Sequence, residues 1–433
     1  MTEKDIIHKL TYLLHGHRRK IFIIFGCLLI STGLNLCIPF ISKEIMDEGF
    51  IGGNKNILLY LVVGSFAIYM LISALNIIKE KVRVEIVAKV QYSLWHQAYE
   101  HLMRMKINYF DDRNAAEIFN NLSVDIANMV SVADESAFFV VTQAFSMVGG
   151  VIGLFILDYR MTILVLLFIP IKAVVMKYFA KYRKKVMDEF ILDSEKYSSW
   201  FGDTVGGVKE VKLFDILDNK HREFDEKQRV VIRKQKKMNM LSQWNSAADD
   251  VLVHLLITLI YIVGSNLVFN MQLSVGSIFA FITYSSYVTG PISAILNIGY
   301  LLSGIIPSTK RYYMFMELDE ENSNQKITTS PQFGDIELKN ISFAYEEGKP
   351  ILDGVSVIFP KGSKTAIIGR NGSGKTTIIN LLTRLYEPEN GQILLNGTNI
   401  ADMSLQAYRE MVSIVSQQIY LFNDSIRNNI CLY

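Results

Sequence analysis

Cysteine, proline and net charge are all scarce in this chain of 433 residues. The three cysteines, Cys27, Cys37 and Cys431, are odd in number and far apart, which excludes a disulfide scaffold. Eight prolines exclude a proline-rich fibre. The 44 basic and 42 acidic side chains leave a net charge of +2, so no bulk field points to nucleic acid as a partner. A hydrophobic fraction of 50% excludes a disordered polymer.

Long apolar runs are present instead, and all of them precede residue 320. The six runs cover residues 21–40, 57–78, 137–157, 161–180, 251–269 and 275–306. Each is close to the roughly 20 residues that an α-helix needs to cross a bilayer. Core helices of a soluble protein are the alternative, but residues 58–78 contain no charged side chain. The sequence therefore predicts a multi-pass protein of the cell membrane, with six spans in contact with membrane lipid.

Basic residues are distributed unevenly between the loops. Those that precede the first span include Lys9, Arg18, Arg19 and Lys20. The segments after the second and fourth spans are also rich in lysine and arginine, whereas the opposite loops hold only Lys43, Lys55 and Arg160. Because cytoplasmic loops carry the excess of positive charge, we expect both the N-terminus and the C-terminus to be cytoplasmic.

The two basic segments are long enough to form stalks. Residues 79–136 and 181–250 are charged, nearly free of glycine and proline, and typical of helices. An unbroken helix over 57–105 would be roughly 74 Å long. The bilayer accounts for about 30 Å of that length. We therefore expect two helical hairpins that project into the cytoplasm.

The composition changes after Glu321, which divides the chain into three predicted regions. Residues 1–321 form the transmembrane domain, the polar segment 322–332 is a linker, and 333–433 belong to a separate, strand-rich domain. Strands are predicted, in chain order, at 336–345, 351–359, 364–368, 392–395 and 412–415. Asn396-Gly397 predicts a hairpin turn after the fourth of these strands.

Residues 369–376 read Gly-Arg-Asn-Gly-Ser-Gly-Lys-Thr, which matches the phosphate-binding loop. A strand precedes the motif, and a helix follows it with Ile378, Leu381, Leu382 and Leu385 on one face. Glycines let the backbone amides surround an anion at the helix N-terminus. Lys375 is then expected to reach the β- and γ-phosphates, and the Thr376 hydroxyl to bind Mg²⁺.

With these motifs, the whole chain resembles an ABC transporter of the exporter type. The resemblance implies a membrane all-α six-helix exporter-type bundle with long cytoplasmic helical extensions, followed by a partial α/β P-loop NTPase domain. It implies ATP and Mg²⁺ as cofactors, Tyr345 as the ring that stacks on adenine, and Gln417 as the Q-loop glutamine near the metal. The implied metal contacts are Thr376 and Gln417, and residues 333–433 would be the N-terminal part of the nucleotide-binding domain. The implied nucleotide contacts are Tyr345, Gly369, Arg370, Asn371, Gly372, Ser373, Gly374, Lys375, Thr376, Thr377 and Gln417.

Two further stretches resemble the intracellular loops of that family. Tyr109-Phe110-Asp111, Glu117 and Asp125 match the first loop, and Gly207, Val208, Lys212 and Phe214 match the second. Taken alone, each stretch is also consistent with a solvated helical turn that has one aromatic anchor. The resemblance places short coupling helices at 108–114 and 213–219.

Other motifs of the family are not found before Tyr433: the LSGGQ-like signature, the Walker B aspartate, the catalytic glutamate and the switch histidine. The chain is therefore either part of a longer polypeptide or a natural truncation, and residues 1–433 alone are expected not to turn over ATP. The resemblance implies alternating access by a half-transporter that pairs with itself or with a different half. The alternatives are a nucleotide-binding membrane protein that does not pump and an inactive fragment.

The transported substrate is left open by the sequence. Asn35, Gln143 and His254 are polar residues of the spans, and such residues are costly in lipid. Asp249 and Asp250 begin the fifth span, where they are equally consistent with the membrane interface. Peptide, lipid and drug-like substrates all fit this pattern.

Overall fold

The computed structural model describes residues 3–111, 113–131, 135–321, 333–346, 348–416 and 419–431. The chain divides into two compact units. The first unit contains Met1–Trp95 and Ser123–Tyr313, and the second contains His96–Leu122 and Met314–Tyr433. The predicted linker 322–332 lies outside the described residues, so the domain boundaries at 321 and 333 stay predictions.

Each of the six predicted apolar segments lies in a helix. These helices are α2 (Arg18–Glu44), α3 (Lys55–Arg104), α6 (Glu135–Leu157), α7 (Tyr159–Gly206), α9 (Leu217–Phe269) and α10 (Val275–Met316). A π-helix, η1 (Ile45–Ile51), continues α2, and α1 (Glu3–His15) precedes it. Within the described residues, four stretches are long and apolar enough to cross a membrane, namely Arg18–Ile51, Lys55–Arg104, Tyr159–Gly206 and Leu217–Phe269; Val141–Leu157 is a shorter apolar helix.

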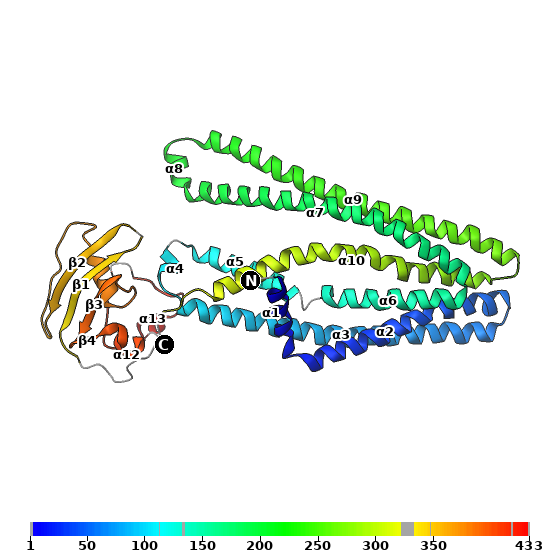
Figure 1. The fold of residues 1–433 in the computed structure, drawn as a ribbon, viewed down its shortest axis with the longest axis horizontal. Helices are drawn as coiled ribbons and strands as arrows, with labels where there is room; N and C mark the ends of the chain where they lie inside the picture. Colours follow the sequence, from blue (N-terminus) through cyan, green and yellow to red (C-terminus); the bar gives the residue numbers. More distant parts are fainter. Residues whose placement is uncertain are drawn as a thin grey trace. The chain divides into compact units, whose positions relative to one another are not determined.

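The predicted stalk helices are confirmed. Helix α3 runs for 50 residues without a break, about 75 Å at the usual rise per residue. Helices α7 and α9, with 48 and 53 residues, pack against each other as a long hairpin closed by the short helix α8 (Val208–Leu213) (Figure 1). Both segments are nearly free of glycine and proline, the residues that most often end a helix, and this accounts for their length.

The positions of the short helices at the stalk tips are only partly as predicted. Helix α4 (Asn108–Asp111) lies inside the predicted range 108–114, and α5 (Ala115–Val130) follows it. The second prediction, 213–219, is wrong because the short helix α8 ends at Leu213. Glycines 206 and 207 end α7 early, and Asp215 adopts the left-handed conformation (φ 52°) that separates α8 from α9.

Four helices form a buried hydrophobic cluster in the first unit. Its buried side chains are supplied by α6, α7, α9 and α10, with Tyr284 of α10 among the largest. The Tyr284 hydroxyl donates a hydrogen bond to the Leu36 carbonyl oxygen of α2. This bond gives the phenol a partner inside an apolar bundle, where an unpaired hydroxyl would be costly.

The second unit contains a four-stranded antiparallel sheet in the order β2-β1-β3-β4 (Figure 1). Its strands are β1 (Ile336–Ala344), β2 (Pro350–Phe359), β3 (Asn390–Leu395) and β4 (Thr398–Asn399). Three predicted strands are thereby confirmed. The predicted hairpin is confirmed too: Asn396 and Gly397 have φ of 49° and 80°, and a type I′ turn requires positive φ at both positions.

Two predicted strands are wrong, at 364–368 and 412–415. Both segments lie outside the sheet, and Ile368 and Val415 are 92% and 94% exposed. An apolar segment becomes a strand only when a neighbour supplies hydrogen-bonding partners along its length. Within the described residues, no strand is paired with either segment.

The helix after the glycine-rich loop is confirmed as α11 (Lys375–Leu382), and Leu381 is completely buried. Leu385 is not on its face, because the chain leaves the helix at Arg384, which has a φ of 54°. The remaining elements are the 3₁₀-helix η3 (Ile400–Asp402), α12 (Leu405–Arg409) and α13 (Ile426–Cys431). The core of this unit joins the sheet to α11, η3 and α12.

Candidate functional site

The glycine-rich loop adopts a conformation that other residues would strain. Gly372 and Gly374 have φ of 83° and 87°, in the left-handed region. A Cβ atom on Gly374 would lie 2.7 Å from Leu352 Cδ2, and one on Gly369 would lie 2.5 Å from Ser373 Oγ. Gly374 is also the N-cap of α11. The loop therefore presents its backbone at the start of a helix, as a phosphate site requires.

Lys375 lies across this loop. Its ammonium group donates hydrogen bonds to the carbonyl oxygens of Gly369 and Arg370, at 2.9 and 2.8 Å. Thr376 is exposed, whereas Thr377 is buried at 4% exposure. A cation is thus held over the loop, and a hydroxyl is accessible beside it, which fits a phosphate and its metal ion.

Tyr345 is held against the helix that begins in this loop. Its hydroxyl accepts a hydrogen bond from the Asn380 side chain of α11 at 3.1 Å, and the residue is 41% exposed. The rings of Phe343 and Tyr386 contact it edge-on, with centroids 4.9 and 5.0 Å away. A fixed, partly exposed ring near the loop suits stacking on a base. The other predicted ligand, Gln417, lies outside the described residues.

A contact missed by the sequence analysis joins the nucleotide-binding region to a stalk tip within the second unit. The Tyr386 hydroxyl donates a hydrogen bond to Asp111 Oδ2 of α4 at 2.7 Å. Burial, and secondly this bond, raise the pKa of Tyr386 well above its usual range, so the phenol keeps its proton. In the sequence, Tyr386 is an aromatic residue that precedes a turn at Glu387-Pro388. That pattern does not indicate which residue its hydroxyl contacts.

An ion pair holds the segment after α10 to α12. The Arg409 guanidinium donates to both carboxylate oxygens of Glu321, at 3.0 and 2.9 Å, and to the Arg384 carbonyl oxygen at 2.9 Å. The Glu321 backbone N–H in turn donates to the Arg104 carbonyl oxygen at the end of α3, at 2.7 Å. The bidentate geometry makes this pair more specific than a single surface contact.

His101 joins the end of α3 to the end of α10. It is 5% exposed, with Nδ1 2.8 Å from Glu320 Oε1 and Nε2 2.9 Å from the Phe315 carbonyl oxygen. The Phe315 ring also packs edge-on against the imidazole, 5.2 Å away. Each nitrogen of the imidazole thus lies within hydrogen-bonding distance of an oxygen atom at or just after the end of α10.

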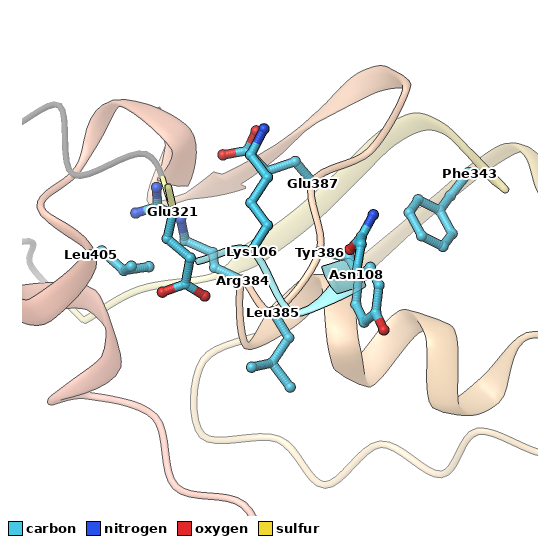
Figure 2. Close-up of a pocket in the computed structure, with 9 residues that line it drawn as sticks. All are labelled: Lys106, Asn108, Glu321, Phe343, Arg384, Leu385, Tyr386, Glu387 and Leu405. Carbon is cyan, nitrogen blue, oxygen red and sulfur yellow. The ribbon is translucent and has the colours of Figure 1, made fainter. Parts of the chain in front are cut away.

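A cavity of about 170 Å³ lies within the second unit, between stalk-tip residues and the segment that follows α11. Figure 2 shows the side chains of Lys106, Arg384 and Glu321 at one part of it and those of Asn108, Tyr386 and Phe343 at another. Burial lowers the pKa of the Arg384 guanidinium, which donates to the Met403 carbonyl oxygen at 3.0 Å. None of the residues that line the cavity is a predicted nucleotide contact. We therefore treat the cavity as separate from the candidate nucleotide site.

The tip of the α7–α9 hairpin has an uncovered apolar surface. Leu213 and Phe214 are 69% and 72% exposed, whereas Val211 of the same short helix is 7% exposed. One face of α8 is thus packed and the other has no cover within the described residues. Exposed apolar clusters of this kind mark sites of contact with other chains.

Long apolar helices that continue into charged helical segments, together with a glycine-rich loop at the start of a helix, are typical of a nucleotide-dependent membrane protein. The family comparison agrees. The model described as the ABC transporter transmembrane region matches residues 21–292, and the ABC transporter model matches residues 352–430. The chain belongs to the ABC transporter family, and its second region is of the type that binds ATP.

Several curated proteins are similar over most of the chain. The ATP-dependent lipid A-core flippase of Haemophilus influenzae (strain 86-028NP) is 27% identical over 406 residues, which cover 90% of this chain and 67% of the flippase. The flippase of the same name from Syntrophus aciditrophicus is 23% identical, over 98% of this chain and 71% of that protein. An uncharacterized ABC transporter ATP-binding protein of Bacillus subtilis, YknV, is 27% identical, over 94% and 68%.

Proposed function

We propose that this chain is a half-transporter of an ATP-driven ABC exporter that works by alternating access. The observation that carries the proposal is the link inside the second unit between a phosphate-binding loop and a stalk tip. Lys375 crosses the loop, and Tyr386, which contacts Tyr345, is hydrogen-bonded to Asp111 of α4. A nucleotide domain that contacts a stalk directly can transmit its closure to membrane helices.

The residues of the loop have separate roles in this proposal. The backbone of 369–376 surrounds the phosphates, Lys375 contacts them as a cation, and Tyr345 stacks on the base. Thr376 and Gln417 would hold Mg²⁺, which screens the phosphate charge when it is bound. Hydrolysis in the whole protein also needs a base and a second phosphate clamp, which the family resemblance assigns to motifs not found in residues 1–433.

A second half-transporter is the proposed protein partner. One bundle of six spans and one nucleotide-binding region make half of the symmetrical assembly that the family uses. The exposed Leu213 and Phe214 at the tip of α8 support an intermolecular contact there. Whether the second half is another copy of this chain is tested by co-purification of two differently tagged copies.

The substrate class favoured by similarity is a lipid. Two of the relatives above carry the name lipid A-core flippase. We propose an amphipathic lipid as the cargo, with peptides and drug-like molecules as the alternatives. Stimulation of the ATPase of the complete transporter by one of these three classes, measured in nanodiscs, distinguishes them.

The nucleotide site is tested by Lys375→Ala. Affinity for a fluorescent ATP analogue should fall about tenfold or more, because a hydrogen bond to a charged group contributes about 1.5–3 kcal/mol. Lys361→Ala, which removes an exposed lysine of the same unit outside the loop, is the matched control and should bind normally. Equal affinities for both variants and the unaltered protein would contradict the site.

A nucleotide-binding regulator that does not pump is the second candidate. It shares the same loop, so nucleotide binding cannot separate it from the exporter. Substrate movement into proteoliposomes distinguishes the two candidates. A complete transporter that binds ATP but moves no lipid, peptide or drug-like probe would favour the regulator.

A further inference from the structure

The second unit contains a continuous set of side-chain contacts from the helix of the phosphate-binding loop to a stalk tip. It begins at Asn380 of α11, whose amide donates to the Tyr345 hydroxyl at 3.1 Å. It continues through the ring contact between Tyr345 and Tyr386, with centroids 5.0 Å apart and planes at 88°. It ends at the 2.7 Å hydrogen bond from Tyr386 to Asp111. Each step joins two described side chains without a gap.

Tyr386 is fixed firmly enough to transmit a displacement. It is 9% exposed, and the Phe343 ring packs against it with centroids 5.6 Å apart and planes at 72°. The same Phe343 ring also contacts Tyr345. Edge-to-face contacts of this geometry are directional, so one ring cannot tilt without moving the next. A close-packed core also passes on small shifts rather than absorbing them.

The hydrogen bond at the stalk end has the usual length of an O–H···O bond, 2.7 Å. Hydrogen bonds to an ionised carboxylate are roughly twice as strong as bonds between neutral groups. Asp111 is itself exposed, and this bond ties its side chain to the segment that follows α11. Tyr386 therefore holds α4 through one specific hydrogen bond.

We propose that Tyr386 is a positioning residue that couples the base-stacking ring of Tyr345 to the stalk tip through Asp111. The inference rests on the proposed nucleotide site. A base stacked on Tyr345 would cover a ring that is 41% exposed and restrict its motion. The Tyr386 ring is then held in the orientation that keeps its hydroxyl on Asp111. Nucleotide binding thereby steadies α4 from the adenine end of the site.

Hydrogen–deuterium exchange of residues 106–111, measured on the purified protein in nanodiscs with and without Mg-ATP, tests this coupling. In the unaltered protein, ATP should slow exchange in this segment. Tyr386→Phe removes only the hydroxyl and should reduce the ATP-dependent protection about fivefold or more, the usual lower bound for coupled sites. The affinity for ATP should change much less than the protection does.

Two variants at the other end of the bond keep the test independent of folding. Asp111→Ala, at an exposed position, should lose protection to the same degree as Tyr386→Phe, and the double variant should be no worse than either. Asp111→Asn retains an oxygen acceptor and should restore part of the protection. If the Tyr386 hydroxyl only stabilised the fold, Asp111→Asn would not restore protection, and the double variant would lose more than either single variant.

Tyr408→Phe is the matched control. Its hydroxyl is also buried, with 1% exposure of the residue, but it donates to the Leu382 carbonyl oxygen at 2.7 Å, and among the described residues it makes no hydrogen bond to α4. This variant should keep full ATP-dependent protection of residues 106–111. Protection that survives in Tyr386→Phe, or is lost equally in Tyr408→Phe, overturns the coupling while leaving the nucleotide site standing. If the unaltered protein binds no ATP, the proposed function and this inference both fail.

Discussion

Lys172 and Asp249 form an ion pair between two helices of the first unit. Lys172 of α7 is completely buried, and its ammonium nitrogen lies 2.8 Å from Asp249 Oδ1 of α9. Lys172 lies in the predicted fourth span, and Asp249 lies at the start of the fifth. A charge among apolar helices is costly unless a partner neutralises it. The pair therefore constrains how α7 and α9 align.

Removing one member of this pair should destabilise the protein more than removing both. Lys172→Met leaves Asp249 without its cation, and Asp249→Leu leaves a buried ammonium, and each loss typically costs about 3–5 kcal/mol. Lys172→Met combined with Asp249→Leu should recover most of the lost thermal stability, because two apolar side chains can pack together. Unfolding of the three variants in one detergent measures this. Losses that simply add would show that the pair has no coupling energy.

Close contact between α6 and α10 depends on glycine. A Cβ atom on Gly153 would lie 2.6 Å from Cε1 of Tyr284, and one on Gly150 would lie 2.9 Å from Cγ2 of Val288. Small residues at a helix interface let helix backbones approach closely when both helices lie in a membrane. The two glycines thereby allow the Tyr284 ring to sit between the helices.

Gly153→Val should lower the thermal stability markedly, because overpacking a well-filled core costs about 1–3 kcal/mol. Gly64→Val is the matched control: a Cβ atom on Gly64 of α3 has no neighbour within 4 Å. Both substitutions change helix propensity alike, so the difference in melting temperature between them isolates packing. Similar melting temperatures for the two variants would contradict the close contact.

The stalk tips are proposed to couple nucleotide binding to transport. Phe110 lies in α4, and Phe214 follows α8 and is 72% exposed. Phe214→Ala or Phe110→Ala in the complete transporter should therefore reduce transport per ATP hydrolysed, with little change in nucleotide affinity. Leu192→Ala, on the exposed shaft of α7 at 56% exposure, should leave that ratio unchanged. A variant that is folded but loses binding and transport together would argue against coupling.

The orientation of the whole molecule in the membrane is predicted from its basic residues. In a protein with Cys27, Cys37 and Cys431 replaced by serine, cysteines at Asn56 and Gln272 should react with an impermeant maleimide on intact cells. A cysteine at Gly206, where a side chain has open space, should react only after the cells are permeabilised. Labelling of position 206 from outside would reverse the predicted orientation.

Much of this protein follows from local sequence. The apolar runs predict the helices, because burial in lipid depends on composition over about 20 residues. The glycines of the loop 369–376 predict a tight turn with positive φ, and Gly372 and Gly374 adopt it. Asn396-Gly397 predicts its turn for the same reason. The phosphate site itself stays a prediction. The nucleotide contacts as a set remain predictions.

Only the tertiary structure decided which distant residues meet. Nothing near Tyr386 in the sequence indicates Asp111, and nothing near Lys172 indicates Asp249, because such pairs depend on the path of the backbone between them. The same reason explains the two wrong strands at 364–368 and 412–415, since pairing with a neighbour, rather than composition alone, makes a strand. Local physics thus determined the elements and the loop, and long-range packing determined the contacts that join the nucleotide-binding region to the stalk tip.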